Sequence, residues 1–422
     1  MNMQAKPTPT AAEAALVEAF TERLSDLPGD AAVAVRRDEA VERIKAGLPN
    51  RRVEAWHYTD LRRLLAAVPP FDPAAKVAPL APLVEGSAVL ATLNGVARPG
   101  APTVEGVAFG RVPDMLADGT FAPALEPQDA ADAVGAINVA FVADGHFVEI
   151  AEDAAVERPI ELQNLIGPGQ SHVRFPVRVG ARARATVVER QAGEAAGFAT
   201  SVSNVVVGEG AELTWVIVQE ESPGATYLGQ FNASIGKDAK LTLFVMNAGG
   251  RLVRQEVRVT AEGEGCEFRL RGVNLLAGDT HCDVTMVLDH LGYGAASTEV
   301  VRNIVLDRAQ GVFQGQIRVA REAQKTDAKM ACNTLLLTDE GEFSTKPELE
   351  IFADDVACGH GATVAEIDAS HLFYLMARGV PEKEARGLLV KAFLAEVIEE
   401  LADEALVAAL EEKLDGWFVE HG

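Results

Sequence analysis

The residues best suited to chemistry lie near the C-terminus, in a short segment that carries Cys358 and His360. If this segment is an extended strand, the two side chains are two positions apart and point to the same face. A thiolate beside an imidazole suits iron or iron–sulfur chemistry better than magnesium or calcium. Spacing alone favours a plainer interpretation, in which Cys358 is a small core residue and His360 a hydrogen-bonded turn residue.

The other three cysteines, Cys266, Cys282 and Cys332, are far apart, and none belongs to a C-x-x-C pair. Neither a disulfide framework nor a closed zinc site is therefore expected. Any metal chemistry must use few ligands or borrow some from another chain. His281 and Cys282 are adjacent, so they would face opposite sides of a strand and form no joint site.

Familiar catalytic motifs are absent from the sequence. It contains no G-x-x-x-x-G-K-[ST] loop, no G-x-S-x-G elbow and no H-E-x-x-H pair, so we expect no nucleotide bound by this chain and no enzyme activity of its own. The adjacent Asp354 and Asp355 keep one alternative open, a β-helix enzyme that acts on carbohydrate. Against it, the chain has only three Trp and four Tyr to stack on sugar rings.

The charge balance narrows the choice of partners. The chain has 38 Lys and Arg against 62 Asp and Glu, a net charge of −24, which repels phosphate backbones and anionic membranes. The N-terminus lacks the apolar run of about 7–15 residues that a secretory signal needs, and no later run of about 18 apolar residues could span a bilayer. We therefore expect a cytoplasmic protein that binds neither nucleic acid nor membrane.

An internal repeat indicates which elements position the Cys358 segment. Residues 179–186, 207–214 and 235–242 resemble one another at a spacing of 28 residues, and residues 261–268 form a weaker fourth copy. Each copy is an apolar strand, a glycine-containing corner and another strand, a unit too small to bury its own apolar face. Stacking of such units predicts a β-helix. An antiparallel sandwich with similar hairpins is the alternative.

Four regions follow from these patterns. We expect an N-terminal helical domain at 1–68, a connector leading into the first strands at 69–137, a β-helix core at 138–367 and a C-terminal helical domain at 368–422. Residues 381–422 hold four Lys or Arg against eleven Asp or Glu. This acidic tail packs back on the solenoid, caps its open end or binds a partner, and capping is the default expectation. Its periodicity places Leu388, Leu389 and Phe393 on one face, as candidates for partner docking or for core packing.

Segments spread over nearly the whole chain resemble the SufB/SufD family of iron–sulfur assembly proteins. The C-terminal matches are TKPELEI at 345–351, CGHGAT at 358–363 and LFYLMARG at 372–379. Near the N-terminus, EAWHYT at 54–59 resembles a motif typical of the SufD branch. The resemblance implies a right-handed parallel β-helix flanked by helical domains.

The resemblance also implies a scaffold role in a complex that builds and transfers nascent iron–sulfur clusters. The chain would pair with a SufB-like paralogue through the β-helix and hold a SufC-like ATPase through its C-terminal helices; the isolated chain could instead form a homodimer. Cys358 and His360 match the family's Cys-x-His positions, where the cluster or iron would be shared with the paralogue. If the chain belongs instead to the SufB branch, it would accept sulfur directly, and Cys266 or Cys332 would become candidates.

Overall fold

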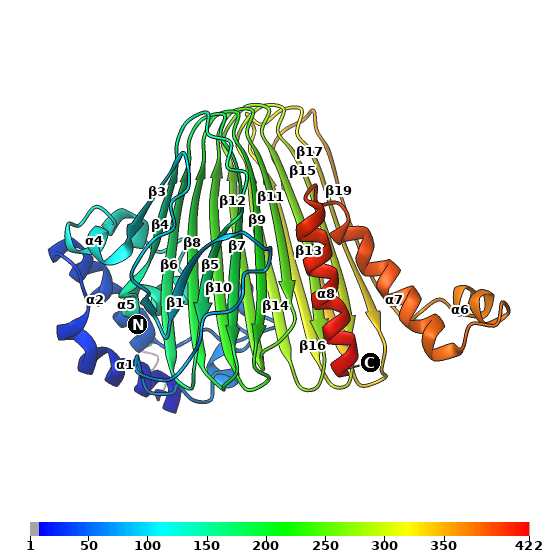
Figure 1. The fold of residues 1–422 in the computed structure, drawn as a ribbon, viewed down its shortest axis with the longest axis horizontal. Helices are drawn as coiled ribbons and strands as arrows, with labels where there is room; N and C mark the ends of the chain where they lie inside the picture. Colours follow the sequence, from blue (N-terminus) through cyan, green and yellow to red (C-terminus); the bar gives the residue numbers. More distant parts are fainter. Residues whose placement is uncertain (1–7, 422) are drawn as a thin grey trace, which may run out of the picture.

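The computed structural model describes residues 8–421, which are organised around a β-solenoid (Figure 1). The strands are β1 (Ala88–Leu93), β2 (Val96–Ala97), β3 (Val107–Arg111), β4 (Asp144–Ile150), β5 (Ile160–Leu165), β6 (Gln170–Val179), β7 (Arg184–Gly193), β8 (Phe198–Val207), β9 (Glu212–Glu221), β10 (Thr226–Ile235), β11 (Lys240–Asn247), β12 (Leu252–Ala261), β13 (Glu267–Leu276), β14 (His281–His290), β15 (Ala296–Val305), β16 (Gln310–Val319), β17 (Asp327–Leu336), β18 (Glu342–Ile351) and β19 (Ala357–Ala365).

From β4 onward, successive strands alternate between two sheets, so each coil adds one strand to each sheet. Sheet A has ten strands in the order β19-β17-β15-β13-β11-β9-β7-β5-β1-β2, and sheet B has nine in the order β18-β16-β14-β12-β10-β8-β6-β4-β3. Neighbours from β4 to β19 pair in parallel, and among the named strands of residues 8–421 only β1 with β2 and β3 with β4 pair antiparallel. The expected parallel β-helix is confirmed, and the antiparallel sandwich is wrong.

The repeat seen in the sequence is the pairing register of the solenoid. Thr186 lies opposite Thr214, and Thr214 lies opposite Thr242, each 28 residues further along the chain. Gly208 and Gly236 occupy successive corners. A Cβ atom on Gly208 would lie 2.8 Å from the Val179 carbonyl oxygen of the coil beneath, so the close stacking of corners requires glycine there.

Apolar side chains fill the lumen between the sheets, together with a column of stacked amides along sheet A. Asn247 donates to Asn274 and Asn274 donates to Asn303, both at 2.7 Å, from strands that pair in register. Asn164 donates to Gln191 in the same way nearer the N-terminus. Such a ladder satisfies buried polar groups and fixes the register of one coil on the next.

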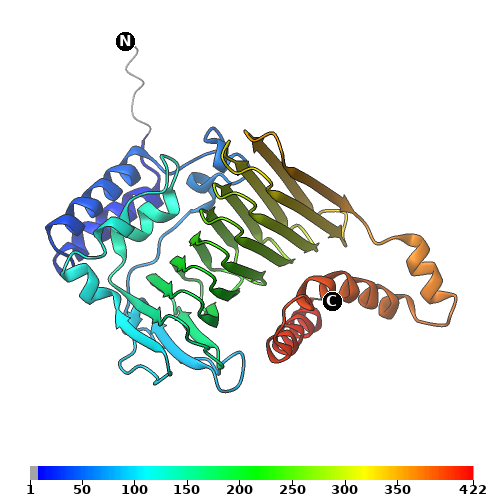
Figure 2. The ribbon, with the colours of Figure 1, turned by 90° about the horizontal axis from the view of Figure 1, so that it is seen from above.

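Helices lie at both ends of the chain and cover parts of the two sheets (Figure 2). They are α1 (Ala11–Arg23), α2 (Ala31–Ala46), α3 (Leu61–Leu64), α4 (Val112–Ala117), α5 (Ala133–Phe141), α6 (Ala369–Met376), α7 (Glu382–Ile398) and α8 (Glu404–His421), with short 3₁₀ turns at Leu24–Asp26, Glu54–Trp56 and Ala122–Leu125.

The N-terminal helices α1 to α5 form one cluster that also contains Phe198, Leu228 and Leu252 of sheet B. α2 and α5 pack together, and Arg37 of α2 is buried where α5 ends. Its guanidinium donates to the Val139 carbonyl at 2.8 Å, among other carbonyls that the helix leaves without partners. The same apolar cluster thus includes residues of α4 and α5, which lie beyond residue 68.

Helices α7 and α8 pack against the side of the solenoid rather than across its end, whereas α6 projects away from it (Figures 1 and 2). Outward-facing apolar residues of sheet A, including Val216, Phe244 and Val273, form a cluster with Leu394 of α7 and Leu410 of α8. The expectation that the tail caps the open end is therefore wrong. Sheet A offers α7 and α8 a long apolar face.

The buried face of α7 also differs from the one expected. Val390, Leu394 and Ile398 are buried, whereas Leu388 is 48% exposed. Phe393 is half-buried against the cluster, with the Arg302 guanidinium 5.1 Å from its ring centroid. Over residues 8–421, none of the helices combines the length and the apolar character that crossing a bilayer requires.

Candidate functional site

The last coil of the solenoid is uncovered, and it carries both residues singled out for metal chemistry. β18 and β19 contain no buried residue, in contrast to the strands below them. In β19, Cys358 lies opposite Ala328 and His360 opposite Met330. Because Ala328 and Met330 are buried in the lumen, Cys358 and His360 occupy lumenal positions of the last coil, on the same face of the strand.

Cys358 and His360 differ in their surroundings. Cys358 is half-buried against the lumenal core, and burial raises the pKa of its thiol, with Asp327 and Glu299 adding negative charge in the same direction. His360 is exposed and lies within a strand rather than in a turn. The pair thus offers one thiol and one imidazole at an open surface. This combination suits iron or a cluster if the thiol loses its proton on binding.

The remaining cysteines lie inside the solenoid. Cys266, Cys282 and Cys332 are buried, and burial raises the pKa of Cys266 and of Cys332 to about 11. Within residues 8–421, no place brings together three His, Cys, Asp or Glu side chains that could hold a metal ion. The residues of β19 therefore offer fewer ligands than a closed metal site contains.

The other candidate residues fall in separate places. His281 faces the N-terminal helices, where its Nε2 lies 2.9 Å from the Thr59 hydroxyl, and Cys282 faces the lumen. Asp355, one of the paired acids behind the carbohydrate hypothesis, forms an ion pair with Lys325. Asp354 and Asp355 follow β18 at the same end of the solenoid, and neither lines a described cavity.

Sequence reasoning noticed the EAWHYT motif but missed what it contacts. The Trp56 ring is buried, its Nε1 donates to the Ala131 carbonyl at 3.1 Å, and the Arg254 guanidinium lies 3.8 Å from the ring centroid. Arg254, on β12, is itself buried and pairs with Glu256 and Asp283. The motif therefore attaches the N-terminal helices to the outer face of sheet B through a buried cation held by two carboxylates.

The same motif reaches the open end of the solenoid. Glu54 forms an ion pair with Lys346 of β18, which also lies 3.2 Å from Glu348. The N-terminal motif and the C-terminal signature segment are thus in direct contact, although they are almost 300 residues apart. The sequence shows only that each of these two distant motifs contains a charged residue. This does not reveal that Glu54 and Lys346 form an ion pair.

Comparison with known proteins assigns the family. A family model described as "SUF system FeS cluster assembly, SufBD core domain" matches residues 163–393, more than half of the chain. The chain belongs to the SufB/SufD family. A SufBD family protein of Mycobacterium tuberculosis is 30% identical over 390 residues, which cover 87% of this chain and 90% of that protein. The matched core begins within β5 and ends within α7, so it contains the Cys358 and His360 strand.

Two relatives are described as iron–sulfur cluster assembly proteins SufD. The protein from Escherichia coli is 33% identical over 238 residues, or 56% of each chain, and the protein from Bacillus subtilis is 30% identical over 220 residues, or 50% of each. The alignments thus span about half the length of these two relatives. The family model and both of these relatives are described in terms of iron–sulfur cluster assembly.

In this SufBD chain, the C-terminal helices expose an apolar surface of their own. α6 has no buried residue, and Phe373 and Tyr374 are 72% and 55% exposed. Leu388 of α7 is exposed and Leu389 is half-buried. Because aromatic side chains are costly to leave in water, this surface is suited to contact with another protein.

Proposed function

We propose that this chain is a SufD-like scaffold that pairs with a SufB-like paralogue through the open end of its solenoid. A nascent iron–sulfur cluster or iron is the cargo held between the two chains. The observation that carries the proposal is the placement of Cys358 and His360 side by side on the uncovered last strand. Two ligands are fewer than the four that iron–sulfur clusters take, so the paralogue supplies the rest.

A SufC-like ATPase docks on the C-terminal helices in this proposal. The exposed aromatic residues of α6 and Leu388 of α7 form the contact, while Val390, Leu394 and Ile398 hold α7 on sheet A. Leu389 and Phe393, both half-buried, contribute to docking and to packing respectively. The chain itself binds no nucleotide and catalyses no reaction, and it acts in the cytoplasm.

The proposed division of labour follows the regions 1–68, 69–137, 138–367 and 368–422, of which residues 1–7 and 422 lie outside the described part of the chain. The first two regions pack against the solenoid, where Trp56 contacts Arg254 of β12. The third presents the ligands, and the fourth receives the ATPase.

Replacing His360 with alanine tests the proposal. His360→Ala should leave the complex with the paralogue and the ATPase intact, because the side chain is exposed, and should reduce the iron and sulfide content of the purified complex severalfold. The measurement is metal analysis and visible absorption of complexes isolated without oxygen. His57→Ala, at an exposed histidine of the N-terminal helices, is the matched control and should change neither quantity. Unchanged iron content in both variants would refute a role for His360.

A further inference from the structure

A concave surface rich in arginine lies on the N-terminal helices and on the loop that follows α2. Residues 43–63 contain six Lys or Arg against two Asp or Glu, an excess of positive charge in a chain whose net charge is −24. Together with Thr10, Asn50 and Asp60, four arginines line a cavity of about 480 Å³ there. We call them the arginine cluster; its members are Arg51, Arg52, Arg62 and Arg63.

Ion pairs within residues 8–421 neutralise only one of the four arginines. Arg62 pairs with Glu13 at 3.0 Å, but the side chains of Arg51, Arg52 and Arg63 form no ion pair with any residue of the described part of the chain. Of the two nearby acids, Glu54 is occupied by Lys346, and Asp60 accepts a hydrogen bond from the Arg63 backbone N–H. Four guanidinium groups thus line the cavity against a single lining carboxylate, that of Asp60, so a negatively charged ligand would be favoured here.

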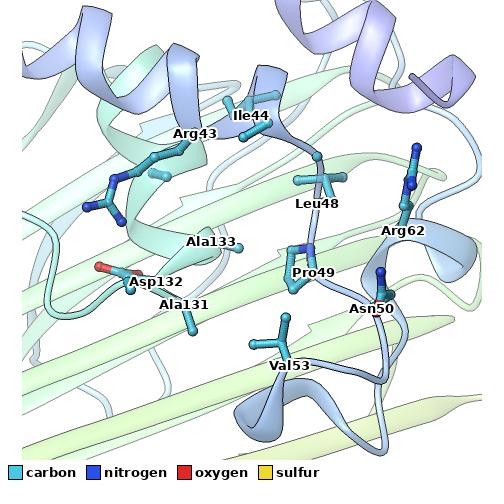
Figure 3. Close-up of a pocket in the computed structure, with 14 residues that line it drawn as sticks. Arg43, Ile44, Leu48, Pro49, Asn50, Val53, Arg62, Ala131, Asp132 and Ala133 are labelled. Atoms are coloured by element: carbon cyan, nitrogen blue, oxygen red, sulfur yellow. The ribbon is translucent and has the colours of Figure 1, made fainter. Parts of the chain in front are cut away.

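An apolar cavity adjoins the arginine cluster. Its volume is about 440 Å³, and its lining includes Leu48, Pro49 and Val53. It shares Asn50 and Arg62 with the arginine-lined cavity, so the two cavities are adjacent. Figure 3 shows Asn50 and Arg62 together at one side of the apolar cavity, with Arg43 and Asp132 at the opposite side. The volume is large enough for a bulky apolar side chain.

We propose that these two cavities together bind an acidic polypeptide segment of another protein, with one large apolar side chain in the Leu48 cavity and carboxylates on the arginine cluster. Arginine forms paired hydrogen bonds with carboxylates, and an apolar anchor beside charged contacts is typical of peptide recognition. A nucleic acid fits less well, because its phosphate backbone would continue beyond this patch over a strongly acidic protein.

The test uses a fluorescently labelled peptide of twelve residues, rich in Glu and Asp with one central Phe, and fluorescence anisotropy with the full chain. The double variant Arg52→Glu/Arg63→Glu should weaken binding at least tenfold, and raising the salt concentration should weaken binding to the unaltered chain. Arg98→Glu/Arg321→Glu is the matched control, because both arginines are exposed and neither forms an ion pair among residues 8–421. This control should bind as the unaltered chain does.

Two further probes examine the parts of the site separately. A peptide with Ser in place of Phe should bind more weakly, and a peptide with Lys in place of its acids should not bind. Equal loss in both double variants, or equal binding of the Phe and Ser peptides, would overturn the proposal. Tighter binding of a single-stranded oligonucleotide, lost with Arg52→Glu/Arg63→Glu, would also overturn it in favour of a nucleic-acid site. Circular dichroism melting of the variants should show unchanged folding, because these side chains are exposed.

Discussion

The thiol of Cys358 is held in its neutral form by its position at the edge of the lumenal core. Burial raises its pKa, and the negative charges of Asp327 and Glu299 act in the same direction. A cation at this site would reverse that balance, because metal binding favours the thiolate. If iron binds there as proposed, the thiol would release its proton on binding.

A buried acid deeper in the lumen gives a pH-dependent prediction. Glu221 is buried, its carboxylate oxygens have no hydrogen-bond partner within residues 8–421, and burial raises its pKa to about 8. The unfolded chain loses this proton near pH 4.5, whereas the folded chain keeps it up to about pH 8. The free energy of unfolding therefore falls as the pH rises from about 4.5 to about 8. Glu221→Gln removes the dependence, so it should raise the melting temperature strongly at pH 8.5 and much less at pH 5.5.

The expected gain in unfolding free energy at pH 8 is on the order of 4 kcal/mol. Circular dichroism melting at several pH values measures it. Glu220→Gln is the neighbouring control, and it should destabilise at both pH values, because Glu220 pairs with the buried Arg190 at 2.8 Å and with Lys413 at 2.9 Å. A gain for Glu221→Gln that is independent of pH would contradict the assignment.

Among the elements, the β-strands were predictable and the placement of the C-terminal helices was not. The repeat at 179–186, 207–214 and 235–242 set the register, because identical corners can stack only in one alignment. The continuous apolar runs in β9 and β11 contained a further signal, since strands buried on both faces lack alternation. They indicate that sheet A is covered on its outer face. The sequence does not show which helices cover it.

The exposed helix α6 gives a prediction at the same scale. Phe373→Ser/Tyr374→Ser should abolish co-purification of a SufC-like ATPase without lowering the melting temperature, because α6 has no buried residue. Leu394→Ala should instead lower the melting temperature, with an expected loss of about 2–5 kcal/mol in unfolding free energy. Pull-down and thermal melting of both variants separate docking from packing. Retention of the ATPase by the α6 variant would move the docking surface elsewhere.

The Cys-x-His spacing predicted the shared face of Cys358 and His360, because alternation in a strand needs only local information. The contact of Trp56 with Arg254 could not be predicted in the same way. It joins residues about 200 positions apart, and no periodic pattern relates them. The same applies to the arginine cluster, which is visible as composition but becomes a concave surface only when α3 folds beside the loop after α2.

For the whole molecule, the uncovered end predicts self-association of the isolated chain. Ile351 and Val364, on β18 and β19, are 40% and 42% exposed at lumenal or edge positions, and open strand edges pair readily with other strands. Ile351→Lys/Val364→Lys should shift the isolated chain towards the monomer in sedimentation velocity experiments. Val206→Lys/Leu291→Lys is the matched control at exposed apolar residues away from that end, and it should leave the distribution unchanged. Equal effects of the two pairs would exclude the open end as the contact.

The helices α7 and α8 stiffen the stack of coils that forms the solenoid. Their shared cluster includes Val188 of β7 and Ile304 of β15, so one rigid pair of helices is fastened to several coils at once. The amide column inside resists sliding between the same coils. A pull on α6 would therefore move the solenoid as a single stiff body, and the displacement would reach the last strand with little loss along the way.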